Sequence, residues 1–216
     1  RLGELAEIDR LLTNNRTGNA YNARRANFLI DLRELAADPA RFNEARTYIE
    51  WRARHDAIVP KAPPAERPWD MEEDAFAEAV QLFDFQLKQR LTFFKEQLEK
   101  ADPFMQPYWL VRRASFHFDN RRLAEAIADF TAAVEQFPDH PRAEVAELML
   151  ARCSLERSRQ LRAAEDAEKH AEEAQTLLED AQDRLEGFIE GHPKSRFLPD
   201  VQGWLGAVSF DRGLLG

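Results

Sequence analysis

The chain has 216 residues, of which 44% are hydrophobic and 32% are charged, and its formal net charge is −9 at pH 7. This length and apolar content allow one domain, or a short solenoid, with a sizeable core. The acidic balance opposes binding to nucleic-acid phosphates or to an anionic membrane face. The single cysteine, Cys153, excludes an intramolecular disulfide, and we expect it as a small buried side chain on a helix.

The residue pattern favours helices throughout. Ala, Leu, Glu and Arg are abundant, and no run of alternating β-branched residues predicts a strand. No transmembrane segment or signal peptide is expected. The chain begins at Arg1 rather than Met, as expected for a trimmed or processed piece, so a removed export signal or lipid-anchoring cysteine stays open.

Residues 1–58 are predicted to hold N-terminal helices with a degenerate helical hairpin. The patterns place these helices at residues 2–12, 20–37 and 39–57. Asp38 is expected to cap the third helix, with Pro39 in its first turn. The second and third helices, joined by this Asp-Pro turn, form the hairpin, which matches a repeat only loosely.

Residues 59–69 interrupt the helical pattern. Four prolines forbid a helix there and favour an extended segment: Pro60, Pro63, Pro64 and Pro68. We interpret the segment as a linker between two halves of the chain or as a loop laid across the surface. A proline-rich ligand for a small recognition domain is the alternative.

A long helix is predicted from Asp70 to Ala101, and Asp102-Pro103 ends it. Its apolar residues recur in steps of three or four: Phe76, Val80, Phe83, Leu87, Leu91, Phe94 and Leu98. Phe85 and Phe93 lie off this stripe and indicate a second contact face. An internal helix of a solenoid needs two such faces.

Residues 107–138 predict two short amphipathic helices joined by a tight turn. Small residues stand where the two helices would have to touch, at Ala114, Ala126 and Ala133. Phe130 fills the space beside them, and Pro138 ends the second helix.

Further helices are predicted at residues 142–160, 161–191 with a bend near Arg162, and 198–211. Pro138 and Pro193 are 193 − 138 = 55 residues apart, and aligning them pairs Met149 with Trp204 and Leu150 with Leu205. Two segments in register indicate a repeat array over residues 70–216. The charged middle of the 161–191 segment indicates a helix that extends beyond the body of the stack.

The small residues, the aromatic and the proline of residues 107–138 resemble a tetratricopeptide repeat. Residues 108–210 resemble the bacterial envelope type of this family, seen in the outer-membrane assembly lipoprotein and the Tol-Pal accessory protein. The resemblance implies an all-α fold, a right-handed superhelical stack of helical hairpins. It also implies a periplasmic or cell-envelope location rather than a cytoplasmic one.

In this family the first helix of each repeat lines a groove that binds a partner. Carried over by position, the resemblance implies a groove lined by Tyr108, Val111, Ser115, Phe118, Asp119, Val145, Leu148, Arg152, Leu155 and Glu156. Tyr108 and Phe118 are the strongest candidates, because aromatic rings give a large contact area at low entropic cost. The alternative is that neighbouring helices bury both rings.

Other charged groups carry weaker signals. A local basic cluster consists of Arg112, Arg113, Arg121 and Arg122. It could bind the acidic tail of a partner, and the alternative is that it forms a solvated face. Asp166, His170 and Glu173 share a helix face, but acidic helices produce such trios by chance, so no metal site is expected. His140 and His192 stand beside prolines, where capping or packing is expected.

The sequence therefore predicts a non-catalytic protein without cofactor or metal. The sequence has neither a nucleophile in a recognisable setting nor a glycine loop that could cradle a phosphate. Neither feature therefore indicates an enzyme. We expect a scaffold that binds a peptide or a partner domain, in the setting of bacterial envelope assembly. The alternative is a structural subunit that associates with itself, or docks into a larger complex, through its repeat ends.

Overall fold

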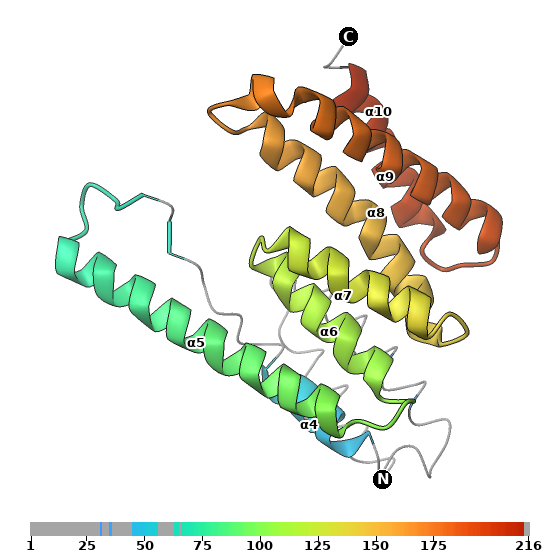
Figure 1. Ribbon diagram of the computed structural model, residues 1–216, viewed down its shortest axis with the longest axis horizontal. Helices are drawn as coiled ribbons and strands as arrows, with labels where there is room; N and C mark the ends of the chain where they lie inside the picture. The colour runs from blue at the N-terminus through green and yellow to red at the C-terminus, as the bar shows by residue number, and fades with distance from the viewer. Residues whose placement is uncertain (1–30, 32–34, 36–44, 56–62, 65, 214–216) are drawn as a thin grey trace. The chain divides into compact units, whose positions relative to one another are not determined.

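The computed structural model describes residues 31, 35, 45–55, 63–64 and 66–213. Every regular element in these residues is helical, which confirms the all-α prediction for this part of the chain. The helices are α4 (Arg46–His55), α5 (Glu73–Lys100), α6 (Gln106–Asp119), α7 (Leu123–Gln136), α8 (Pro141–Arg162), η1 (Ala167–His170), α9 (Ala171–Gly191) and α10 (Leu198–Gly213) (Figure 1). The predicted helix at 2–12, most of 20–37 and the start of 39–57 lie outside the described residues.

The chain divides into two compact units, Arg1–Leu87 and Lys88–Gly216. The division falls inside α5 rather than at the proline-rich segment 59–69.

In the first unit, α4 is tied to an earlier part of the chain through Asp31. The Tyr48 hydroxyl and the Arg52 guanidinium each donate a hydrogen bond to the Asp31 carboxylate, both at 2.5 Å. All three side chains are buried. A buried charge is tolerated when it is paired in this way, so the contact holds α4 to Asp31.

In the second unit, the last turns of α5 pack through aromatic residues. Phe94 is fully buried, and its ring centroid lies 5.6 Å from that of Phe116 and 6.3 Å from that of Trp109. Phe93, which lies off the main apolar stripe, meets Trp109 edge-on at 5.7 Å. The second contact face predicted from Phe85 and Phe93 is not present as expected, because Phe93 meets the same Trp109 ring as Phe94, and Phe85 is 59% exposed.

Helices α6 and α7 form the hairpin predicted from residues 107–138 (Figure 1). Its small contact residues, Ala114, Ala126 and Ala133, are fully buried around an equally buried Phe130. The turn between the helices is a Schellman motif, in which Arg121 adopts a left-handed conformation with φ of 58°. The Arg121 and Arg122 amides donate to the carbonyls of Phe118 and His117 at 3.0 and 2.9 Å.

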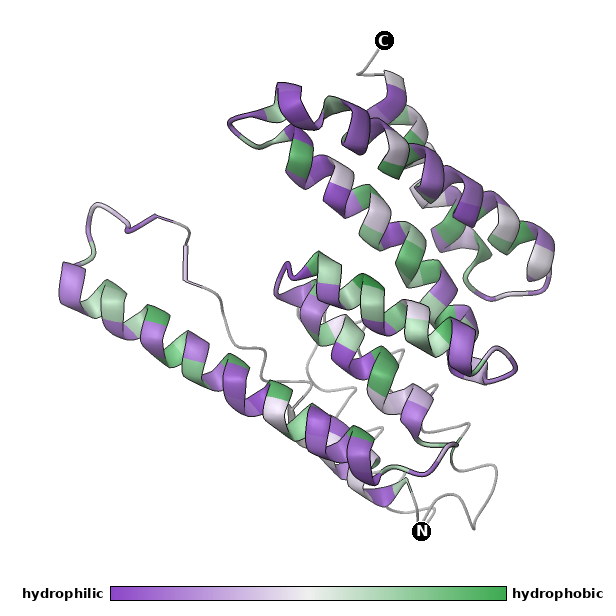
Figure 2. Cartoon of the chain, viewed as in Figure 1, coloured by the Kyte–Doolittle hydropathy of each residue, from purple (hydrophilic) through white to green (hydrophobic). Residues whose placement is uncertain are grey.

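One predicted boundary is wrong. Residues 161–191 do not form one helix with a bend, because α8 ends at Arg162, a turn and η1 follow, and α9 begins only at Ala171. Residues 163–170 include no buried side chain, so little tertiary packing stabilises an α-helix there. The buried stripe of α9 starts later, at Ala174, Leu178, Ala181, Leu185 and Phe188. Figure 2 shows hydrophilic residues along the side of α9 that faces the viewer.

Helices two apart in sequence also touch in this unit. Helix α8 contacts its neighbours α7 and α9, and it also contacts α6 and α10. One buried cluster joins α6, α7 and α8 through residues such as Val111, Phe130 and Val145. A second joins α8, α9 and α10 through residues such as Leu155, Leu178 and Val208. Among the described helices, none has both the length and the apolar character needed to cross a membrane.

Candidate functional site

The predicted groove residues fall into a buried and a partly exposed set. Val111 lies in the core formed by α6, α7 and α8, and Leu155 lies in the core formed by α8, α9 and α10. Val145 and Leu148 are buried in the same two cores. These four side chains hold the helices together and offer little surface to a partner.

Tyr108 is only 1% exposed. Its ring meets the His140 ring edge-on at 5.0 Å and lies 5.8 Å from the Phe104 ring. The Arg142 guanidinium lies over its face at 5.4 Å. Tyr108 is therefore buried by its neighbours, which is the alternative given in the sequence analysis, and it does not line a groove.

The partly exposed set lies toward the end of α6 and the middle of α8. Ser115 is half-buried, and its hydroxyl donates to the Val111 carbonyl at 2.7 Å within the same helix. Asp119 is exposed at the last residue of α6, and Glu156 is half-buried on α8. Phe118, next to Asp119 on α6, and Arg152, one turn before Glu156 on α8, are both half-buried.

Arg152 lies between two aromatic rings from two different helices. Its guanidinium carbon is 4.7 Å from the ring centroid of Phe118 on α6 and 5.3 Å from that of Trp204 on α10. Cation–π contacts at such distances stabilise an arginine by about 0.5–1 kcal/mol each at partly exposed sites. We call Phe118, Arg152 and Trp204 the α6–α8–α10 face, since each of these alternate helices supplies one residue.

Arg152 differs from Arg157 and Arg159 on the same helix in its charge partners. Arg157 pairs with Glu173 at 3.4 Å, and Arg159 pairs with Asp211 at 2.7 Å. Among the described residues, Arg152 forms no such ion pair with a carboxylate. Its positive charge is therefore held in place by two rings and remains available to an anionic group.

The geometry of this face depends on the contact between α8 and α10. The Asp211 carboxylate is buried on α10 and accepts from Arg159 at 2.7 Å. Arg162 lies 3.2 Å from the same carboxylate. These ion pairs fix the register of the two helices, and so keep Trp204 beside Arg152.

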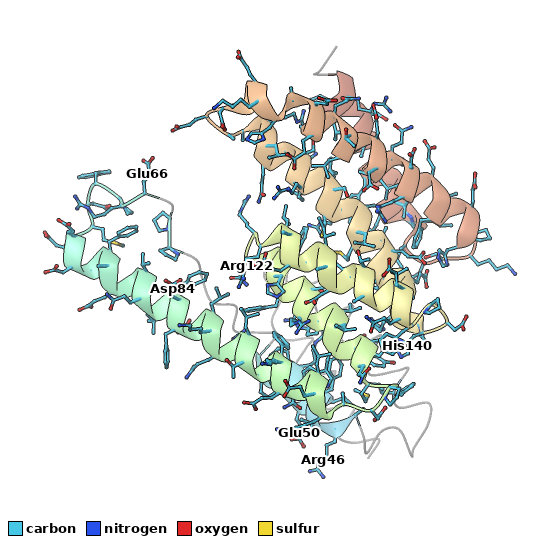
Figure 3. All side chains as sticks on the ribbon, viewed as in Figure 1. Arg46, Glu50, Glu66, Asp84, Arg122 and His140 are labelled. Atoms are coloured by element: carbon cyan, nitrogen blue, oxygen red, sulfur yellow. The ribbon has the colours of Figure 1, made fainter. Side chains whose placement is uncertain are left out.

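The basic cluster predicted on α6 is largely neutralised within its own hairpin. Arg113 donates two hydrogen bonds to Asp129, and Arg122 pairs with Glu125. Arg112 is buried and Arg121 is exposed in the turn. Figure 3 shows Arg122 at the start of α7, where it follows this turn. The cluster is not one continuous basic surface.

His117 lies inside this polar hairpin contact. It is 7% exposed, and its Nε2 atom is 3.9 Å from the Asp129 carboxylate. Burial lowers the pKa of His117 below its ordinary value of 6.5, although the negative charge of Asp129 opposes this effect. The ring is therefore neutral at neutral pH.

The two histidines that precede prolines, His140 and His192, cap or pack against helices, as predicted. His140 caps α8, because its Nδ1 atom accepts from the Arg142 amide at 3.1 Å (Figure 3). His192 lies 2.8 Å from a Glu147 carboxylate oxygen and stacks near Phe188 at 4.6 Å. The first contact caps the N-terminus of α8, and the second joins the C-terminal end of α9 to the first half of α8.

The structure also shows the surroundings of a possible reactive thiol, Cys153, and of a possible metal-binding trio around His170. Cys153 is fully buried, as expected, and burial raises the pKa of its thiol to about 12, so it is not a reactive thiolate. In the trio on the charged segment, His170 faces Asp166 through Nε2 at 3.5 Å and Glu173 through Nδ1 at 3.7 Å. Since the two carboxylates face different nitrogen atoms of the ring, the three side chains do not converge on one point. Among the described residues, no group of three potential ligands is arranged to hold a metal.

Trp204 is the site residue that the sequence pattern did not indicate. The 55-residue register pairs it with Met149, which is not a groove position, so the carried-over pattern passes over it. One turn further along α10 stands Val208, a core residue, so the local pattern indicates packing rather than a binding site. Only the packing of α10 against α8 brings the indole to Arg152.

Comparison of the chain with protein-family models, with curated proteins and with solved structures found no match.

Proposed function

We propose that the second unit is a short repeat solenoid of the tetratricopeptide kind that serves as a non-catalytic protein-interaction scaffold. The contacts of α8 with both α6 and α10 support this proposal, because repeats stack through their first helices as well as through adjacent ones. The small residues buried between α6 and α7 support it too. The bacterial envelope setting rests on the resemblance of residues 108–210 alone.

The observation that carries the proposed function is the position of Arg152 between Phe118 and Trp204. Two flat rings fix the guanidinium, so less side-chain entropy is lost when it binds a partner. Planar guanidinium groups form strong hydrogen bonds with carboxylates. We therefore expect a partner segment that places an acidic side chain, or a terminal carboxylate, against Arg152 and apolar groups against the two rings.

Affinity capture from a cell extract tests this function when it compares two arginine variants of the same helix. Arg152→Gln removes the charge of the α6–α8–α10 face, whereas Arg157→Gln removes a charge that pairs with Glu173 elsewhere on α8. We expect a partner that the unchanged chain and Arg157→Gln retain and that Arg152→Gln loses. Equal retention by all three chains would refute the assignment of this face.

Self-association through a repeat end is the second candidate, and an exposed aromatic on α10 favours it. Phe210 is 67% exposed on this last described helix, where a stacked neighbour would cover it. Sedimentation velocity at several concentrations decides between the two. A monomer at every concentration excludes self-association, whereas an oligomer that Phe210→Ser dissociates supports it.

A further inference from the structure

Exposed large apolar side chains are concentrated in the first half of α5 and just before it. Trp69, Leu82 and Phe85 are 94%, 57% and 59% exposed, and they lie within a short stretch of the chain. Leu82 and Phe85 share one side of α5 with the exposed residues Glu78 and Gln89, because steps of four, three and four residues follow a helix face. We call these four residues the α5 face.

The surroundings of this face are strongly acidic. Residues 66–89 contain two basic residues, Arg67 and Lys88, and seven acidic ones, so their formal charge is 2 − 7 = −5. The acidic residues are Glu66, Asp70, Glu72, Glu73, Asp74, Glu78 and Asp84. All seven carboxylate side chains are exposed. Figure 3 labels two of them, Glu66 ahead of α5 and Asp84 on it.

We propose that the α5 face docks a basic amphipathic helix of a partner protein. An exposed helix offers apolar ridges, and a second helix fills them with its own side chains at matching spacing. Leu82 and Phe85 supply the apolar contacts, and the carboxylates around them attract lysines or arginines that flank the apolar stripe of the partner.

The same charges exclude the other candidate occupants. A second copy of this chain would place one acidic face against another, and like charges across an interface oppose association. Anionic lipid and nucleic-acid phosphates are repelled in the same way. This partner differs from the one expected at the α6–α8–α10 face, where Arg152 favours an acidic group.

A fluorescent synthetic peptide tests the proposal with the full chain. The probe is a three-heptad helix of leucine at the core positions and lysine elsewhere, and its binding is measured by fluorescence anisotropy. The paired substitutions Leu82→Ser/Phe85→Ser remove the apolar contacts. The paired substitutions Ala124→Ser/Ala128→Ser are the matched control, because they place two serines at exposed apolar positions on another helix, α7. Circular dichroism checks that all variants keep their helices.

We expect binding to weaken about tenfold or more for Leu82→Ser/Phe85→Ser and to stay unchanged for Ala124→Ser/Ala128→Ser. Asp74→Asn/Glu78→Gln, two turns and one turn before Leu82 on the same side of α5, should weaken binding and reduce its salt dependence, whereas Glu186→Gln/Glu190→Gln on α9 should do neither. Equal binding by Leu82→Ser/Phe85→Ser and the unchanged chain overturns the proposal. Binding of a peptide with glutamate in place of lysine, or of a second copy of the chain at the α5 face, overturns it as well.

Discussion

Arg113 on α6 donates two hydrogen bonds to Asp129 on α7, at 2.7 and 2.6 Å, and thereby joins the two helices of the hairpin. Asp129 is 8% exposed, so its charge depends on this partner for stability. The pair stands next to His117, whose ring faces the same carboxylate. The hairpin therefore has a polar contact beside its small-residue core, and both determine its stability.

The ion pair predicts the cost of removing one partner. Asp129→Asn should lower the free energy of unfolding by about 1.5–3 kcal/mol, because charged hydrogen bonds of this kind contribute that amount. Urea denaturation measures the loss. Glu135→Gln, at an exposed position of the same helix, is the control and should change stability little. An Asp129→Asn chain as stable as the original would show that the pair contributes nothing.

His117 predicts a loss of stability in weak acid. Its folded pKa is below the ordinary value of 6.5, so below pH 6.5 the unfolded chain binds a proton that the folded chain does not. The stability is fully present above pH 6.5 and is lost as the pH falls from there through the lower folded pKa. The slope for one proton is at most about 1.4 kcal/mol per pH unit.

Urea denaturation between about pH 7.5 and about pH 5 tests this linkage with two variants. His117→Gln should remove this part of the pH dependence, whereas His170→Gln, on the charged segment before α9, should keep it. If His117→Gln and the unchanged chain lose stability in parallel, then the burial of His117 does not affect the pH response.

The turn between α6 and α7 predicts a stabilising substitution. Arg121 has a positive φ, which costs an ordinary side chain about 1 kcal/mol or more, and glycine adopts this conformation freely. Arg121→Gly should therefore raise the midpoint of thermal unfolding, with a gain of about 0.5–1 kcal/mol. A lower midpoint would contradict the left-handed conformation at this position.

The small-residue contact predicts the effect of added volume. Ala126→Leu places a larger side chain between α6 and α7, and overpacking of this kind costs about 1–3 kcal/mol. Ala128→Leu is the matched control on the same helix, because Ala128 is exposed. The midpoint of thermal unfolding should fall for the first variant only, and equal midpoints would show that α6 and α7 do not pack closely at Ala126.

Local patterns predicted the hairpin well. Ala114, Ala126, Ala133 and Phe130 indicated the close contact of α6 and α7, because helix packing at short distance demands small residues at fixed spacing. The prolines likewise marked where helices end. In contrast, the 161–191 segment was predicted as one helix, since its residues favour helix locally but lack buried partners before Ala174.

The candidate site was predicted only in part. The repeat register correctly indicated Phe118 and Arg152, but it also indicated Tyr108, which is buried. The register predicts which side of a helix a residue lies on, but not which neighbouring side chains cover that side. Trp204 could not be found in this way, since its contact with Arg152 depends on how α10 packs against α8. Long-range packing of this kind has no local sequence signal.

Site-specific photo-cross-linking tests the α6–α8–α10 face most directly. A photoreactive amino acid is placed at position 119, which is exposed beside Phe118, or at position 183, which is exposed on α9. The account predicts that the captured partner cross-links to position 119 and not to position 183. Cross-linking at position 183 alone, or equally at both positions, would contradict it.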